Sequence, residues 1–201
     1  LSLINVMSVL IFFPETLTGA RKKFNIQWLR SFKNIIAAYS MKALRVPFIS
    51  SFLFQAGFSF FITFFSIYLI NKYEFSQGNI GDFFAYIGVW TVFSQVFVNS
   101  NVSKWFKEST VLKISLIALA ASIALFFVPR TSWGLLFIVP FFAMFIGLVQ
   151  ANFLSLISRS VGPDKQGEIL GVNSSINTLG QSLPPILSGY IAALLTPSSP
   201  I

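Results

Sequence analysis

The side chains that could do chemistry inside the apolar segments of this chain are neutral amides and hydroxyls, and they recur at helical spacing. The chain has 201 residues and contains neither His nor Cys, so imidazole bases, thiol nucleophiles, disulfides and the usual zinc ligands are excluded. Amides and hydroxyls can hydrogen-bond a small molecule or its water, but they do not ionise near neutral pH. The sequence therefore predicts recognition of a small-molecule substrate, with no catalytic residue, no metal and no cofactor.

Four apolar segments carry these polar side chains as stripes. Gln55, Ser59 and Thr63 follow one another at intervals of four residues, which places them on one side of a helix. Buried amides cost free energy unless they meet partners or water. The stripes therefore form hydrogen bonds between helices or line a shared aqueous cavity, and we favour the cavity for the four stripes together. The expected lining of this substrate path, in which two aromatic residues supply ring contacts, is Gln55, Ser59, Thr63, Tyr86, Trp90, Gln95, Gln150, Asn177 and Gln181.

The segments that must position these residues are long enough to cross a membrane. Apolar residues make up 55 % of the chain and charged residues only 10 %, and the mean hydropathy is +0.76. Soluble domains carry roughly 25 % charged residues, so a soluble globular domain is excluded. A transmembrane helix needs about 20 apolar residues. The gaps between charged residues then predict five spans, near 47–71, 83–103, 111–128, 133–158 and 169–195.

The distribution of Lys and Arg predicts the orientation of these spans. Residues 14–46 hold seven basic residues, and the connections that follow hold one, three, one, two and none. By the positive-inside rule, the segment with seven basic residues is cytoplasmic. Membrane orientation thus explains the formal net charge of +8, and no nucleic-acid partner is expected.

Two short motifs resemble a known family. The run Val161–Glu168, which contains Gly162-Pro163-Asp164, is similar to the entry into helix 11 of major facilitator superfamily transporters, and Phe13-Pro14-Glu15 resembles the close of their helix 6. Within that superfamily the chain resembles the tetracycline/proton antiporter branch of multidrug efflux proteins. The resemblance implies an all-α integral membrane protein, with a six-helix half-bundle that is a fragment of a 12-helix fold. It runs from the end of helix 6 to helix 11.

The resemblance also implies residues with helix-packing or gating roles. A glycine and proline pattern in the last span follows the register of the family's antiporter motif, and the loop Ser103–Glu108 resembles a second copy of its basic gating motif. Lys107 stands where the family usually has glycine, and the third span lacks the acidic residue that tetracycline exporters carry. The residues assigned to packing or gating are Gly171, Gly180, Pro184, Pro185, Gly189, Lys104 and Lys107.

The expected organisation has three parts. Residues 1–14 are the end of transmembrane helix 6, residues 15–45 form a cytoplasmic central loop with an amphipathic helix, and residues 46–201 form the C-terminal transmembrane bundle. The expected partners are a small-molecule substrate, the lipid bilayer and the missing N-terminal half of the same chain. The full-length protein is expected to be a multi-pass monomer in the bacterial inner membrane.

The function favoured by these features is secondary active transport, specifically proton-coupled export of a drug-like or amphipathic molecule by alternating access. None of the five predicted spans contains an acidic residue, so a proton-coupling carboxylate would lie elsewhere. One alternative is a superfamily uptake carrier for a sugar, an organic anion or another metabolite. A further alternative is a membrane scaffold that transports nothing. An enzyme is not expected, because paired carboxylates and nucleophile–base pairs are absent from the spans.

Overall fold

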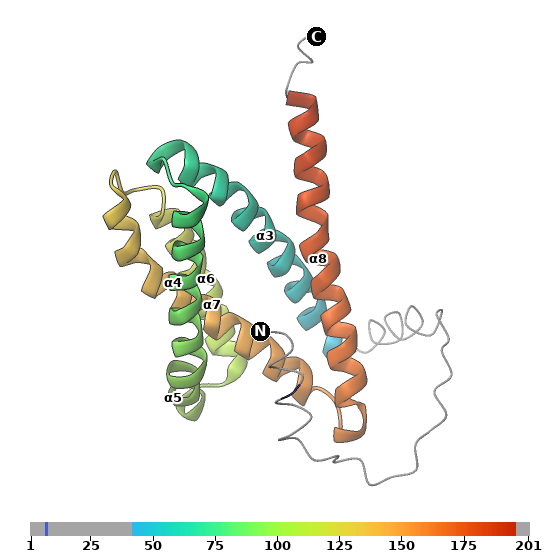
Figure 1. Ribbon diagram of the computed structural model, residues 1–201. Coiled ribbons are helices and arrows are strands. Elements are labelled where there is room, and N and C mark those ends of the chain that lie inside the picture. The colour runs from blue at the N-terminus through green and yellow to red at the C-terminus, as the bar shows by residue number, and fades with distance from the viewer. Residues whose placement is uncertain (1–6, 8–41, 196–201) are drawn as a thin grey trace.

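The computed structural model describes Met7 and residues 42–195, and over these residues it is built of helices without a strand (Figure 1). The elements are α3 (Lys42–Tyr73), α4 (Gln77–Phe93), the π-helix η1 (Ser94–Val98), α5 (Asn99–Trp105), α6 (Glu108–Leu125), α7 (Ser132–Arg159), the 3-10 turn η2 (Pro163–Lys165) and α8 (Gln166–Leu195). The expected end of helix 6 and the expected amphipathic helix lie outside the described residues.

Within the described part of the chain, four helical segments have the length and hydropathy needed to cross a membrane. They are Leu44–Tyr73, Gln77–Trp105, Glu108–Leu125 and Ser132–Arg159, and they coincide with the first four predicted spans. The fifth prediction, near 169–195, corresponds to α8, which is also a long helix. Its stripe of Ser, Asn, Thr and Gln lowers its hydropathy, and α8 falls outside that group of four.

The second span begins earlier than the charge pattern predicts. Ser76 is the N-cap of α4, and its Oγ accepts a hydrogen bond of 3.2 Å from the backbone N–H of Asn79. A capping hydroxyl satisfies one of the free N–H groups at a helix start. Asp82, which the gap between charges placed at the boundary, consequently lies within α4.

The first span ends in a left-handed residue. Glu74 has a φ of 54°, and its N–H donates to the carbonyl of Ile70 at 3.0 Å while the N–H of Phe75 donates to that of Leu69 at 3.4 Å. These bonds close the helix as an αL cap does. The chain reversal brings Phe75 against Phe83 at the start of the next span, with ring centroids 6.2 Å apart.

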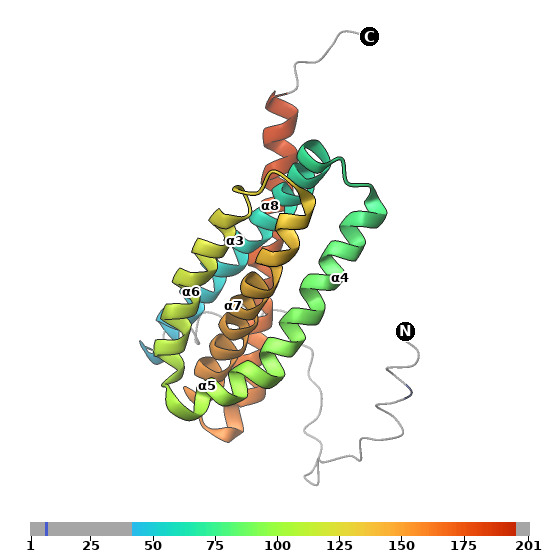
Figure 2. The ribbon, with the colours of Figure 1, turned by 90° about the vertical axis from the view of Figure 1, so that its left-hand side faces the viewer.

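Helix α7 is the centre of the bundle. It packs against α3, α4, α6 and α8, and Figure 2 shows it running between α6 and α4. One apolar core joins α3, α4, α6 and α7, and includes Phe65, Phe126 and Phe142. A smaller core joins Leu44 and Phe48 of α3 to Ile157 of α7 and to α8. The bundle is therefore arranged around α7, and α3 and α8 also pack directly on each other.

Phenylalanine rings fill the larger core. The ring centroids of Phe61 and Phe65 lie 4.8 Å apart, those of Phe65 and Phe126 lie 5.0 Å apart, and those of Phe126 and Phe142 lie 5.2 Å apart. Aromatic pairs at such spacings contribute about 0.5–1.5 kcal/mol beyond the burial of their area. Lipid tails are as apolar as these rings, so close packing rather than water exclusion holds the helices together.

One span contains a π-helix at a place where the sequence has no proline or glycine. Helix α7 continues through Pro140, and α8 continues through Pro184 and Pro185. Between α4 and α5, by contrast, the helix widens to the π form over Ser94–Val98, a segment with neither Pro nor Gly. Single π turns add one residue to a turn and are frequent at functional sites.

Candidate substrate path

The polar stripes of α3 and α8 meet each other. Figure 1 shows these two helices side by side. The Ser51 hydroxyl donates to Asn177 Oδ1 at 2.8 Å and lies 3.5 Å from Asn173 Oδ1. Ser51 and Asn173 are buried. We call this contact the α3–α8 seam, and at this point its amides are used to join two helices.

A second bond of the α3–α8 seam repairs a gap in α8. The Ser59 hydroxyl donates to the backbone carbonyl of Gln181 at 3.0 Å. In an unbroken helix this carbonyl would accept from the N–H of the residue four positions later, but that residue is Pro185, which has no N–H. The Ser59 side chain thus supplies the donor that the proline removes.

Gly180 allows α3 and α8 to approach closely. A Cβ atom at this position would lie 3.0 Å from the carbonyl oxygen of Phe52 and 3.1 Å from Cβ of Gln55. Gly171, from the same motif, would place its Cβ in open space. Pro184 is fully buried. Among these motif residues, Gly180 and Pro184 pack, whereas Gly171 does not. Gly189 lies in α8, but its contacts are outside the part of the chain that the structure describes.

Gln55 is the polar residue of the α3–α8 seam whose hydrogen bonding is incomplete. Its Oε1 is buried and has no hydrogen-bond partner among the described residues. An unpaired buried acceptor is costly, and such groups often mark a place where a ligand or water binds. Thr63, one turn further along the stripe than Ser59, instead donates to the Ser59 carbonyl of its own helix at 2.9 Å.

A second polar contact joins α4, η1 and α5 to α7, and we call it the α4–α7 seam. Gln95 Nε2 donates to Gln150 Oε1 at 3.1 Å, and both side chains are exposed. One helical turn away, Asn152 Nδ2 donates to Asn99 Oδ1 at 3.0 Å. The Gln95–Gln150 pair is therefore an exposed polar contact between two helical segments.

The π-helix η1 makes the closest contact with α7 in this seam. Ser94 begins η1, and its hydroxyl donates to the Met144 carbonyl of α7 at 2.7 Å. Opposite it, a Cβ on Gly147 would lie 2.9 Å from Cβ and Oγ of Ser94 and 3.0 Å from the Thr91 carbonyl. Only glycine fits there without movement, so the widened turn and Gly147 together set the distance between the two helices.

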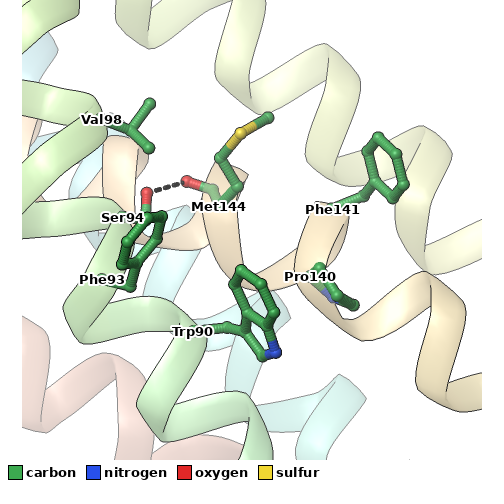
Figure 3. Close-up of a pocket in the computed structure, with 7 residues that line it drawn as sticks. All are labelled: Trp90, Phe93, Ser94, Val98, Pro140, Phe141 and Met144. Atoms are coloured by element: carbon green, nitrogen blue, oxygen red, sulfur yellow. Dashed lines mark hydrogen bonds between the residues drawn. The ribbon is translucent and has the colours of Figure 1, made fainter.

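Trp90 lines a small apolar hollow beside the α4–α7 seam. Figure 3 shows its indole facing Pro140 of α7, with Phe93 on the same helix and the Ser94–Met144 hydrogen bond further along the same hollow. The hollow has a volume of about 120 Å³. Its full lining is Trp90, Phe93, Ser94, Val98, Pro140, Phe141 and Met144. Tyr86, one turn earlier, meets Trp90 edge to face with centroids 6.3 Å apart.

The predicted path residues, Thr63 apart, thus fall into three groups of contacts. Gln55, Ser59, Asn177 and the Gln181 backbone belong to the α3–α8 seam, Gln95 and Gln150 belong to the α4–α7 seam, and Tyr86 and Trp90 form an aromatic pair beside it. The role of these residues in binding a substrate stays a prediction.

Sequence reasoning missed two residues that the seams use. Ser51 lies four residues before Gln55, so the interval that located the stripe could have included it. Ser94 lies three residues after Thr91, an interval that also falls on one helical face, and its hydroxyl contacts the Met144 carbonyl of α7.

The loop with the predicted gating lysines forms a turn without glycine. Phe106 and Lys107 both have extended backbones, and Lys107 is the N-cap of α6. A two-residue extended link needs no positive φ, which explains why lysine can stand where the related motif has glycine. Lys104 Nζ donates to Asn101 Oδ1 at 3.2 Å, and Glu108 pairs with Arg159 at 2.5 Å, tying this turn to the end of α7.

Membrane-length helices joined by neutral polar seams define a polytopic helical membrane protein. Among the described residues no group of acidic side chains could hold a metal ion. Residues 1–185 match the family model described as Major Facilitator Superfamily, and the chain belongs to this family. The superfamily is one of membrane transporters rather than enzymes, in agreement with the expectation for this chain.

The chain is also similar to curated bacterial proteins. Quinolone resistance protein NorA of Staphylococcus aureus (strain MRSA252) is 26 % identical over 159 residues, which cover 78 % of this chain and 40 % of that protein. Multidrug resistance protein 1 of Bacillus subtilis (strain 168) is 25 % identical over 162 residues, which cover 80 % of this chain and 40 % of that protein. The chain matches less than half the length of these relatives.

Proposed function

We propose that this chain is the C-terminal half of a secondary transporter that exports drug-like or amphipathic molecules by alternating access, coupled to protons. Family membership supports transport, and the names of the two similar proteins, which refer to quinolone and multidrug resistance, support export of such molecules. The bilayer would be a bacterial cell membrane, with the loop before α3 on the cytoplasmic side.

The observation that carries the proposal is the exposed Gln95–Gln150 pair. Hydrogen bonds that only join helices are normally enclosed between them, as at Ser51 and Asn173. The two glutamines instead leave donors and acceptors open, since each amide can make more hydrogen bonds than the one they share at 3.1 Å. A scaffold gains nothing from an open amide pair in an apolar span, whereas a transporter uses one to hold a substrate or its water.

The test is dye export by the full-length protein in inverted membrane vesicles, with rhodamine 6G as an amphipathic probe. Gln95→Ala and Gln150→Ala should each lower the transport rate at limiting dye by about 10-fold, the effect of losing one or two substrate hydrogen bonds. The matched control is Ser100→Ala, because the exposed Ser100 hydroxyl donates to the Phe97 carbonyl of its own helix at 3.1 Å. The control should transport normally.

Protein abundance in the membrane separates transport from folding in this experiment. Both glutamine variants should accumulate as the parent does, because neither side chain is buried. Parental transport in both variants would remove the pair from the substrate path. Absence of dye export from the parent, with or without a pH gradient, would contradict the proposed export itself.

A further inference from the structure

The π-helix η1 separates two amides that a regular helix would place on one face. Gln95 and Asn99 are four residues apart, an interval that stacks side chains in an α-helix. Across η1, however, the N–H of Asn99 donates to the carbonyl of Ser94, five residues earlier, so Asn99 is stacked over Ser94 instead. Gln95 is exposed, whereas Asn99 is half-buried. The two amides therefore project in different directions.

Helix α7 presents a partner to each of these amides. Gln150 and Asn152 are two residues apart, so their side chains leave the helix about 200° apart. Gln150 is exposed and Asn152 is buried. Gln95 Nε2 donates to Gln150 Oε1 at 3.1 Å, and Asn152 Nδ2 donates to Asn99 Oδ1 at 3.0 Å. Because the two partners lie on different sides of α7, the separation of Gln95 from Asn99 lets each amide meet its own partner.

Two buried side chains hold η1 at its ends. Ser94 begins η1, is 1 % exposed, and donates its hydroxyl to the Met144 carbonyl of α7 at 2.7 Å (Figure 3). At the other end, Asn152 is also 1 % exposed, and its Nδ2 donates to the Leu148 carbonyl of its own helix at 2.7 Å as well as to Asn99. Both hydrogens of this amide are thereby used, so Asn152 presents a fixed donor to the residue that follows η1.

The wider turn depends on these anchors, because the local sequence does not impose it. π-Helices are rare, and Ser94–Val98 contains neither the proline nor the glycine that would disturb an α-helix. In the α form, Ser94 and Asn99 would lie about 140° apart, so they could not both keep their present contacts with α7. Loss of either anchor should therefore loosen the register of Gln95 against Gln150.

We propose that Ser94 and Asn152 are positioning residues for substrate binding at the exposed Gln95–Gln150 pair. Neither touches the substrate. They hold η1 in the π form, which keeps Asn99 at the buried side of the α4–α7 seam and leaves Gln95 beside Gln150 with open hydrogen-bonding capacity. This inference rests on the proposed function, because it concerns how the amides that bind the substrate are held. It extends the substrate site from two exposed side chains to the buried contacts behind them.

The first experiment measures the geometry of the pair and needs no transport. In the full-length protein, with any cysteine outside these 201 residues replaced by serine, Gln95→Cys and Gln150→Cys are introduced together. A short bifunctional methanethiosulfonate reagent then joins the two thiols. Adding Ser94→Ala or Asn152→Leu should slow this cross-linking about 5-fold, the effect of losing a hydrogen bond that holds η1.

The second experiment is dye export from inverted vesicles. Ser94→Ala should raise the dye concentration that gives half-maximal transport about 5-fold and leave the maximal rate unchanged. In a Gln95→Ala background the same change should have no further effect, because Ser94 acts through Gln95. A purely structural role would instead lower protein abundance or add to the effect of Gln95→Ala.

The control variant is Ser122→Ala, because the buried Ser122 hydroxyl donates to the Ala118 carbonyl of its own helix at 2.8 Å. It should cross-link and transport as the parent does. Parental cross-linking in both Ser94→Ala and Asn152→Leu, or additive effects of Ser94→Ala and Gln95→Ala, would overturn the proposal. Should one variant fail to accumulate, the other decides. Parental transport by Gln95→Ala would contradict the proposed substrate path and leave the cross-linking result intact, so the two failures are distinguishable.

Discussion

At the scale of single residues, the bond between Ser59 and the Gln181 carbonyl gives a direct test of how α8 tolerates its prolines. Ser59→Ala removes the donor and should lower the free energy of unfolding by about 1 kcal/mol. Thermal unfolding in detergent measures this change. Ser66→Ala is the matched control, because the Ser66 hydroxyl donates to the Ile62 carbonyl of its own helix at 3.0 Å. Equal melting temperatures for the two variants would show that the Ser59 bond contributes nothing.

Gln55 is the residue at which stability and transport should move in opposite directions. Its buried Oε1 has no partner among the described residues, so Gln55→Met, which keeps the length of the side chain, should raise the free energy of unfolding by about 1 kcal/mol. If this oxygen accepts a hydrogen bond from the substrate, the same variant should export dye more slowly. Thermal unfolding and vesicle transport on one preparation measure both effects. A variant with parental stability and parental transport would contradict this assignment.

At the scale of helices, Gly147 should control the fit of α7 against η1. Gly147→Ala places a methyl group 2.9 Å from Ser94, so it should push the helices apart and cost about 1–3 kcal/mol. Gly88→Ala is the control, because a Cβ there meets nothing within 4 Å, and alanine favours a helix by about 0.5–1 kcal/mol over glycine. The two variants should shift the melting temperature in opposite directions. A neutral Gly147→Ala would mean that the seam adapts without cost.

The helices also show how much of the fold the sequence could predict. Gaps between charges locate the spans because a charge inside the bilayer is costly, and each predicted span coincides with a helix. Boundaries were less accurate, because Ser76 caps α4 through a local hydrogen bond that a charge pattern does not register. Side chains from the stripes of α3 and α8 meet at a seam, but which stripe pairs with which depends on helix order around α7. The π turn at Ser94 depends on tertiary packing and had no local signal.

At the scale of the whole molecule, orientation across the membrane can be read with single cysteines, since these 201 residues contain none. Trp105→Cys and Phe137→Cys replace side chains that are 83 % and 79 % exposed, one at the end of α5 and one inside α7. Only the first lies at the end of a span, so an impermeant maleimide should label it in inverted vesicles and leave it unlabelled in intact cells. The cysteine inside α7 should be unreactive in both. Labelling of Trp105→Cys in intact cells would reverse the predicted orientation.

The hydrogen bond from the Ser59 hydroxyl of α3 to the Gln181 carbonyl of α8 links the effects of mutations at two distant positions. Because Ser59 replaces the amide that Pro185 lacks, the harm done by losing the serine depends on the proline being present. A chain that carries Ser59→Ala should regain stability through a second change, Pro185→Ala, which restores an N–H to bond the Gln181 carbonyl within α8. A selection for suppressors of Ser59→Ala should therefore return changes at Pro185, which lies 126 positions later in the chain. Among related sequences, the residues at these two positions should covary.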